Sequence, residues 1–171
     1  MSNHWHFRLI FLLHILNLVF CVCVLCATEE IPDKKYLKIE QKLKTTTDPI
    51  SKAKILIQMA DFQLRGAAHQ VKKSNFTEAD QYLARYRAII RQTQEILESS
   101  GRNAQKNPAG FKDFEIALRK QLRRLDDLRP DYPYEQAQKL DETIEEAKAV
   151  KESMLVQIFG AGNFGKRKED K

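Results

Sequence analysis

The sequence predicts an all-α protein: an up-and-down antiparallel helical bundle of four long helices plus a short leading helix, placed after an N-terminal signal peptide. Three observations lead to this prediction. Apolar residues recur at steps of three and four within residues 48–99, 107–128 and 134–159, which is the spacing of one buried helix face. No segment shows the alternation at every second residue that a half-buried strand needs. Finally, residues 9–27 are almost wholly apolar and turn polar at once at Thr28.

Residues 1–27 have the layout of a secretory signal peptide. A polar, weakly basic segment ends at Arg8, and the apolar run that follows ends at Ala27. This run is also long enough to span a bilayer, so an uncleaved anchor is the alternative. Lipidation of Cys26 is a poorer alternative, because Leu25 precedes it where a small residue is usual. All three cysteines lie in this segment, so the domain that follows cleavage would have no disulfide.

The mature chain divides into a helical bundle domain, residues 28–159, and a flexible Gly-rich and charged tail, residues 160–171. We therefore expect an exported protein, periplasmic or extracellular, or one that stays membrane-anchored through residues 9–27. The domain is long enough to bury a core of its own without disulfides.

The central element of the bundle is a helical hairpin over residues 48–99 that turns at Ser74-Asn75. Asp48-Pro49 predicts the start of its first helix, with an acceptor at the N-cap and proline at N1. Asn75 followed by Glu78 predicts a capping box at the start of the second. A connection this short makes the two helices antiparallel neighbours. The expected buried residues are Ile50, Ala53, Ile57, Ala60, Leu64, Ala67 and Val71, then Phe76, Ala79, Leu83, Tyr86, Ile90, Thr93 and Leu97.

Three further helices cover this hairpin. A short one is expected at residues 34–44, one from Asn107-Pro108 to Leu128, and a last one from about Tyr134 to Phe159, after two prolines break the chain. Their expected buried residues are Tyr36, Ile39 and Leu43; Phe111, Phe114, Leu118, Leu122 and Leu125; and Ala137, Leu140, Ile144, Ala147, Val150 or Lys151, Met154 and Ile158.

The turn of the hairpin carries the segment Lys73-Ser74-Asn75-Phe76-Thr77-Glu78-Ala79, with Tyr82-Leu83 after it. This segment resembles the turn and second-helix start of a tetratricopeptide repeat, which implies a structural role for its residues. The resemblance covers one hairpin, because no second copy follows at the period of 34 residues. The overall pattern is similar to exported bacterial helical proteins of unknown function, which implies a location and a fold.

The formal charge of the 171-residue chain is +6, with acids and bases interleaved. Interleaved charge is typical of solvated helix faces, and an exported protein meets little nucleic acid. The densest basic cluster is Arg119, Lys120, Arg123 and Arg124. It is the candidate partner-binding surface, for an acidic protein or a phosphate-bearing surface. The alternative is that the cluster has no binding role and is a solvated outer face whose charge is balanced by nearby acids.

Candidates for chemistry are few. Glu142 and Glu146 share a helix face, but hydrolysis by carboxylates needs two of them placed across a cleft. His69 is the only histidine after the leader and is interpreted as a boundary residue. Tyr82 and Tyr86 are expected at the core edge, with their hydroxyls reaching water. We expect no cofactor and no metal site, because neither a cofactor motif nor a metal-ligand set is present.

These observations favour a non-enzymatic exported protein of the cell envelope that acts as a protein-interaction or structural module. The expected partner is a protein of the envelope. The alternative is a binder of anionic lipid, glycan or other envelope polymer through the basic helix face, and a carboxylate-only hydrolase is the least favoured reading.

Overall fold

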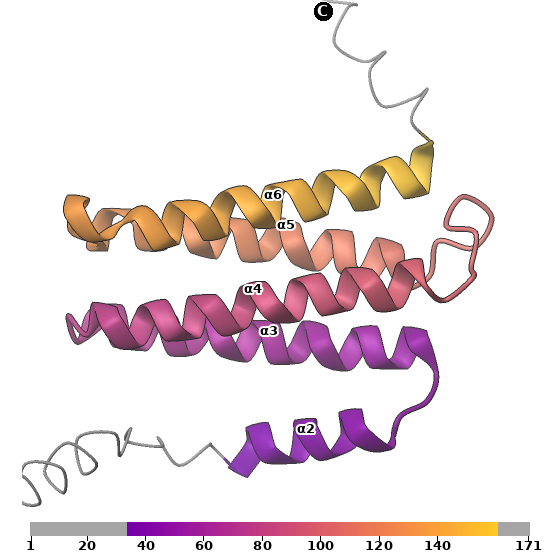
Figure 1. Cartoon of the computed structure of the whole chain (residues 1–171), viewed down its shortest axis with the longest axis horizontal. Helices are drawn as coiled ribbons and strands as arrows, with labels where there is room; N and C mark the ends of the chain where they lie inside the picture. Colours follow the sequence, from indigo (N-terminus) through magenta and orange to yellow (C-terminus); the bar gives the residue numbers. More distant parts are fainter. Residues whose placement is uncertain (1–33, 161–171) are drawn as a thin grey trace, which may run out of the picture. The chain divides into compact units, whose positions relative to one another are not determined.

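The computed structural model describes residues 34–160, so the predicted signal peptide and most of the predicted tail lie outside the described residues. The described part is all-α, as predicted, with five α-helices, two short 3₁₀ segments and no strand. The elements are α2 Lys34–Thr45, α3 Pro49–Lys72, α4 Phe76–Glu98, α5 Phe111–Leu128, η1 Arg129–Asp131, η2 Tyr134–Gln136 and α6 Gln138–Phe159. Figure 1 shows α3 beside α4 and α5 beside α6, with α2 outside α3.

The hairpin of α3 and α4 forms where the sequence predicts it. The Asp48 carboxylate accepts a hydrogen bond of 2.8 Å from the Ser51 N–H, which confirms the predicted N-cap. At the other end Ser74 has a φ of 59° and its N–H donates to the Val71 carbonyl, while the Asn75 N–H donates to the Gln70 carbonyl. These two bonds are those of a Schellman motif, in which a left-handed residue ends a helix and reverses the chain.

The capping box predicted at Asn75 and Glu78 is wrong. The Asn75 side chain caps no N–H of α4; its Nδ2 donates instead to Oε1 of Gln70, at 3.2 Å. The physical reason is the Schellman turn, which holds the Asn75 backbone against the end of α3 and so directs the side chain back toward that helix.

The start of α5 differs from the prediction, because the helix begins at Phe111 and not at Pro108. Its N-cap is Gly110, with a φ of 86°. A Cβ on Gly110 would lie 2.6 Å from Ile50 Cδ1 and 3.1 Å from Leu97 Cδ2. Gly110 thus combines a positive φ, which an L side chain rarely adopts, with close contact to the hairpin. Because this φ is not helical, α5 starts at the next residue. The last helix is also shorter than predicted, because Tyr134–Gln136 forms a separate 3₁₀ turn before α6.

The four long helices share one core. All predicted stripe positions of α5 are buried, and Val150 rather than Lys151 fills the alternative position on α6. In α3 and α4 the predicted residues are buried except Ile57 and Phe76, which are half-buried. The core residues that are at most 2% exposed include Leu56, Leu64, Leu83, Tyr86, Ile90, Leu97, Phe111, Phe114, Leu118, Leu125, Leu140 and Met154. Periodicity therefore identifies the buried face of every long helix.

The two helices of the hairpin approach each other closely at Gly66. A Cβ at this position would lie 2.3 Å from Cε1 of Tyr82, whose ring occupies the space that a side chain on α3 would need. Tyr82 is half-buried there and receives the Arg85 guanidinium 5.0 Å from its ring centre. The glycine is thus a packing residue within a helix that would otherwise favour alanine.

Candidate functional site

The basic cluster (Arg119, Lys120, Arg123 and Arg124) lies on the outward side of α5, where all four residues are exposed. The opposite side of the helix is held in the core by Leu118, Leu122 and Leu125. Because successive residues of a helix are 100° apart, burying these leucines turns the four cations toward solvent.

Two members of the cluster are neutralised by neighbours within the bundle. Arg119 Nε lies 2.8 Å from Oε1 of Glu115, one turn earlier on α5, and that carboxylate is almost buried. Arg124 Nη1 lies 3.3 Å from Oδ1 of Asp61 on α3. The Arg119 pair lies within α5 and the Arg124 pair links α5 to α3, so both arginines are less available to a partner than the sequence suggests.

Lys120 and Arg123 remain as exposed cations. Neither has a carboxylate within 4.0 Å among residues 34–160. Ile116 lies one turn before Lys120 and is half-buried without belonging to the core. The candidate surface is therefore narrower than the predicted cluster, and consists of two unpaired cations beside one apolar side chain.

The Asp61 carboxylate that pairs with Arg124 is also part of a polar chain across the core. Gln121 Nε2 donates to Asp61 Oδ1 at 3.0 Å, and the Tyr86 hydroxyl donates to Gln121 Oε1 at 3.2 Å. Tyr86 and Gln121 are fully buried, and burial, followed by the charge of Asp61, raises the pKa of Tyr86. The prediction that the Tyr86 hydroxyl reaches water is wrong, because the hydroxyl is buried and donates its hydrogen bond to the buried amide of Gln121.

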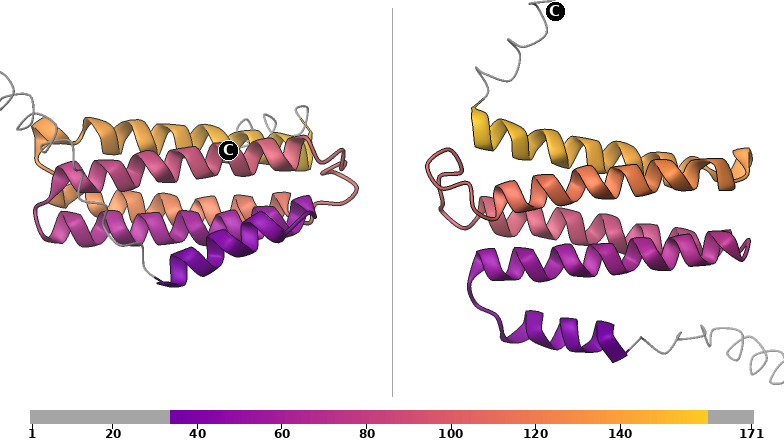
Figure 2. Two further views of the ribbon diagram at one scale, coloured as in Figure 1. Left: turned by 60° about the horizontal axis from the view of Figure 1, so that its bottom comes forward. Right: turned by 180° about the vertical axis from the view of Figure 1, so that it is seen from behind.

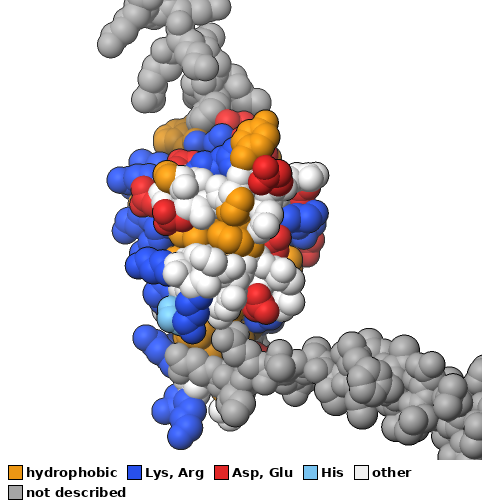
Figure 3. All heavy atoms as spheres, turned by 90° about the vertical axis from the view of Figure 1, so that its left-hand side faces the viewer, with side chains coloured by type: hydrophobic (Ala, Val, Ile, Leu, Met, Phe, Trp, Pro, Cys, Tyr) orange, Lys and Arg blue, Asp and Glu red, His pale blue; other side chains and the backbone are white. Residues whose placement is uncertain are grey.

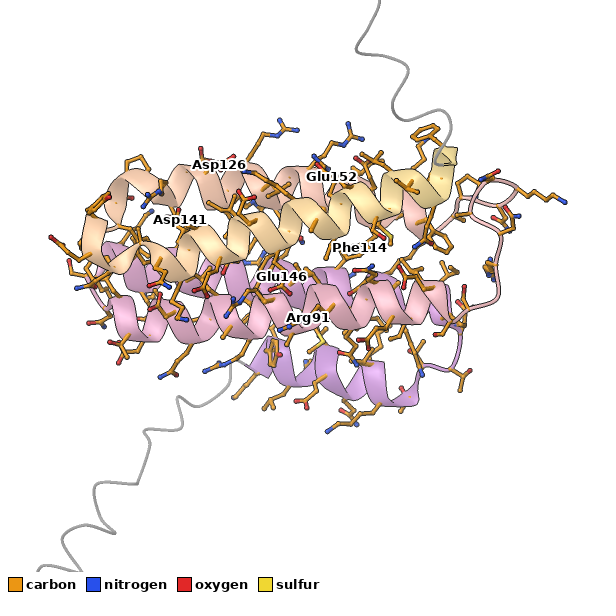
Figure 4. The ribbon with its side chains drawn as sticks, turned by 45° about the horizontal axis from the view of Figure 1, so that its top comes forward. Arg91, Phe114, Asp126, Asp141, Glu146 and Glu152 are labelled. Carbon is orange, nitrogen blue, oxygen red and sulfur yellow. The ribbon has the colours of Figure 1, made fainter. Side chains whose placement is uncertain are left out.

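The predicted acidic pair lies between α6 and α4, where arginines of α4 hold it. Glu142 Oε2 accepts hydrogen bonds from Arg87 Nη1 and Lys139 Nζ, each at 3.2 Å. Arg91 Nε lies 3.0 Å from Glu146 Oε1, and Figure 4 shows these two side chains facing each other between the helices. Glu146 Oε1 has no hydrogen-bond partner among the described residues, so this contact is an ion pair without a hydrogen bond.

The protonation of Glu142 does not suit acid catalysis. The hydrogen bond from Lys139 is the largest cause of a lowered Glu142 pKa. A general acid in glycoside hydrolysis needs a carboxyl group whose pKa is raised. In this geometry Glu142 and Glu146 form ion pairs that link α6 to α4.

His69 and the two tyrosines near the α5–α6 connection have no partners that point to catalysis among the described residues. His69 is exposed near the end of α3. Tyr132 is buried and donates to Asp80 Oδ1 at 3.4 Å, whereas Tyr134 is 88% exposed. Within residues 34–160 no group of three or more His, Cys, Asp or Glu side chains is arranged to hold a metal ion. None of the helices described is both long and apolar enough to cross a membrane.

One end of the bundle carries the α3–α4 turn and the α5–α6 connection. The described surface is charged along one edge of this end. Figure 3 shows Lys and Arg side chains following this edge, with apolar side chains nearer the middle of the end. Comparisons of the chain with protein families, with characterised proteins and with solved structures give no match. The fold and surface thus define an all-helical protein, and its function has to be inferred from its own residues.

Proposed function

We propose that the protein is a non-enzymatic interaction module of the cell envelope, an up-and-down helical bundle exported by residues 1–27, which docks an acidic protein partner through Lys120 and Arg123. The observation that carries this proposal is that these two exposed cations have no carboxylate within 4.0 Å in the part of the chain that the structure describes, whereas their neighbours Arg119 and Arg124 are paired. Charged groups at the rim of an interface steer association and select a partner of opposite charge.

Ile116 supports a protein partner over a simple polyanion. This isoleucine is half-buried and lies one turn from Lys120 and two turns from Arg123 on the same side of α5, so it offers some apolar contact area that a glycan or polyphosphate chain does not use. The alternative, binding to an anionic envelope polymer through the same face, relies on charge alone and therefore predicts a steeper loss of binding with salt. Carboxylate-only hydrolysis is the least supported function, because Glu142 and Glu146 are engaged by Arg87, Lys139 and Arg91.

The experiment is in-cell cross-linking and affinity capture of the tagged full chain, carried out on the wild type and on K120E/R123E. A matched control is K72E/K73E, which makes the same change of charge at two exposed lysines away from α5. We expect one acidic protein to be captured by the wild type and the control and lost from K120E/R123E, with the far-ultraviolet spectrum unchanged.

Binding of the purified partner would then be measured at two salt concentrations. Equal capture by K120E/R123E would contradict the proposed surface, and recovery of a polymer that is released by salt would favour the alternative. The intact mass of the captured chain tests the export proposal: a start near Thr28 indicates cleavage of residues 1–27, and the full-length mass indicates that residues 9–27 are kept as a membrane anchor.

A further inference from the structure

Helix α2 presents two different faces. Its inner residues Tyr36, Ile39 and Leu43 are half-buried and pack against the core of the bundle. The Tyr36 ring lies 5.0 Å from the Phe62 ring of α3, with their planes inclined at 41°. No residue of α2 is fully buried. The helix therefore lies on the bundle surface with one side attached, and its other side faces outward.

The outward side carries a row of lysines at four-residue steps, Lys34, Lys38 and Lys42, which we call the lysine row. All three are exposed, and none has a carboxylate within 4.0 Å among the residues described. The only acid of α2 is Glu40, which pairs with Lys44 at 3.4 Å. Like charges at this spacing repel one another along a helix. The row therefore gains stability from any anion that lies along it.

The arrangement fits a flat anionic surface. Three cations in line along one exposed helix face contact a plane at once, and Figure 2 shows α2 as the outermost helix, next to α3. Leu37, beside the row, is 45% exposed, which gives an apolar side chain that can enter a lipid headgroup region. This row is separate from the cations on α5 that the proposed function uses.

The order of the sequence favours a lipid membrane as this surface. Only residues 28–33 separate the apolar run 9–27 from Lys34. While that run is in a bilayer, Lys34 can lie no farther from its end than about 25 Å, which is the length of seven extended residue steps. Lysines next to a membrane-inserted segment are attracted by anionic lipid headgroups. We propose that the lysine row of α2 binds the anionic headgroups of a membrane.

The test uses the full chain reconstituted in vesicles of phosphatidylcholine alone and of phosphatidylcholine with about one-third phosphatidylglycerol. Amine-reactive labelling followed by mass spectrometry reports on each lysine, with Lys72, Lys73 and Lys112 as exposed internal controls. In the anionic vesicles we expect labelling of the lysine row to fall about fivefold per residue, since each lysine near such a surface gains about 1 kcal/mol. Salt of about 1 M, where the screening length is about 3 Å, should restore labelling.

A second measurement compares chains that all keep residues 9–27, so a difference between them reports the lysines and not the insertion of the apolar run. Amide exchange within α2 should slow in anionic vesicles for the wild type and for K72Q/K73Q/K112Q, and should not slow for K34Q/K38Q/K42Q. Equal protection of the control lysines would overturn the proposal, because it would show attraction to net charge alone. Protection of the row by soluble heparin but not by anionic vesicles would also overturn it, in favour of a polymer site.

Discussion

The hydroxyl of Tyr86 on α4 donates a hydrogen bond of 3.2 Å to Oε1 of Gln121 on α5, inside the core. Both side chains are fully buried, and Gln121 in turn donates to Asp61 on α3. Three helices of the bundle are thus tied by one polar chain whose inner members have no access to water. Such a chain fixes the relative register of the helices, because a shift of any one would leave buried polar atoms unpaired.

Replacing this hydroxyl should lower stability. Tyr86→Phe keeps the ring but leaves Gln121 Oε1 without its donor, so we expect the free energy of unfolding to fall by about 1–3 kcal/mol. Urea denaturation followed by circular dichroism measures this. Tyr134→Phe is the control, because Tyr134 is 88% exposed and its change should stay within about 0.5 kcal/mol. Equal effects of the two substitutions would show that the buried hydrogen bond contributes little.

The turn between α3 and α4 can be stabilised. Ser74 holds a φ of 59°, a conformation that costs an L-residue with a Cβ about 1–2 kcal/mol. Because glycine avoids this cost but loses more chain entropy on folding, we expect Ser74→Gly to raise the free energy of unfolding by roughly 0.5–1 kcal/mol. Ser99→Gly at the αR C-cap of α4 is the control and should not be stabilising. A less stable Ser74→Gly variant would contradict the left-handed assignment.

The effect of Gly66→Ala on stability should depend on the Tyr82 ring, which occupies the space that a Cβ at position 66 would need. In an open helix glycine to alanine is stabilising by about 1 kcal/mol, but here the new Cβ would lie 2.3 Å from the Tyr82 ring. We expect Gly66→Ala alone to give no gain in thermal stability. The same substitution made in a Tyr82→Ala background should then add about 1 kcal/mol. Additive effects of the two changes would show that the ring does not occupy this space.

Glu146 should matter more than its neighbour Glu145. Glu146 faces both Arg87 and Arg91, and the Arg87 side chain is only 22% exposed. Glu146→Gln removes the carboxylate that lies 3.0 Å from Arg91 and leaves Arg87 with Glu142 as its remaining carboxylate among the described residues. We therefore expect a loss of about 1 kcal/mol in the free energy of unfolding. Glu145 pairs with Lys148 alone among residues 34–160, and its side chain is 73% exposed. Glu145→Gln should therefore cost less than about 0.5 kcal/mol, and a reversed order would contradict this account of the α4–α6 contact.

Asp48 should make the stability of α3 depend on pH. The hydrogen bond from Ser51 is the largest cause of a lowered Asp48 pKa, relative to its ordinary value of 3.8. Because the folded value lies below the unfolded one, the stabilisation is complete above pH 3.8 and is lost as the pH falls through the lowered pKa. Asp48→Asn keeps an N-cap without a charge, so thermal unfolding between pH 5 and pH 2 should show a smaller dependence on pH for this variant. An unchanged slope would exclude Asp48 as the titrating group.

The sequence by itself determined the all-α class and which side of each long helix is buried. Residues such as Leu64, Leu83 and Leu118 repeat at helical spacing, and that spacing is a property of the chain alone. It also determined the start of α3, since an aspartate followed by proline is a local cap that needs no distant partner.

Tertiary structure decided what depends on contacts between helices. It moved the start of α5 past Gly110, because the chain passes Ile50 and Leu97 there with a φ of 86°, which is not a helical value. It also buried the Tyr86 hydroxyl, because Gln121 offers an acceptor only once α4 and α5 pack together. The candidate surface shows the same division: sequence spacing grouped four cations on α5, and only packing showed that Asp61 neutralises Arg124 while Lys120 stays free of a carboxylate among the described residues. A pattern along one helix reports which residues face outward, but the charge that remains on a face depends on side chains that reach it from the next helix.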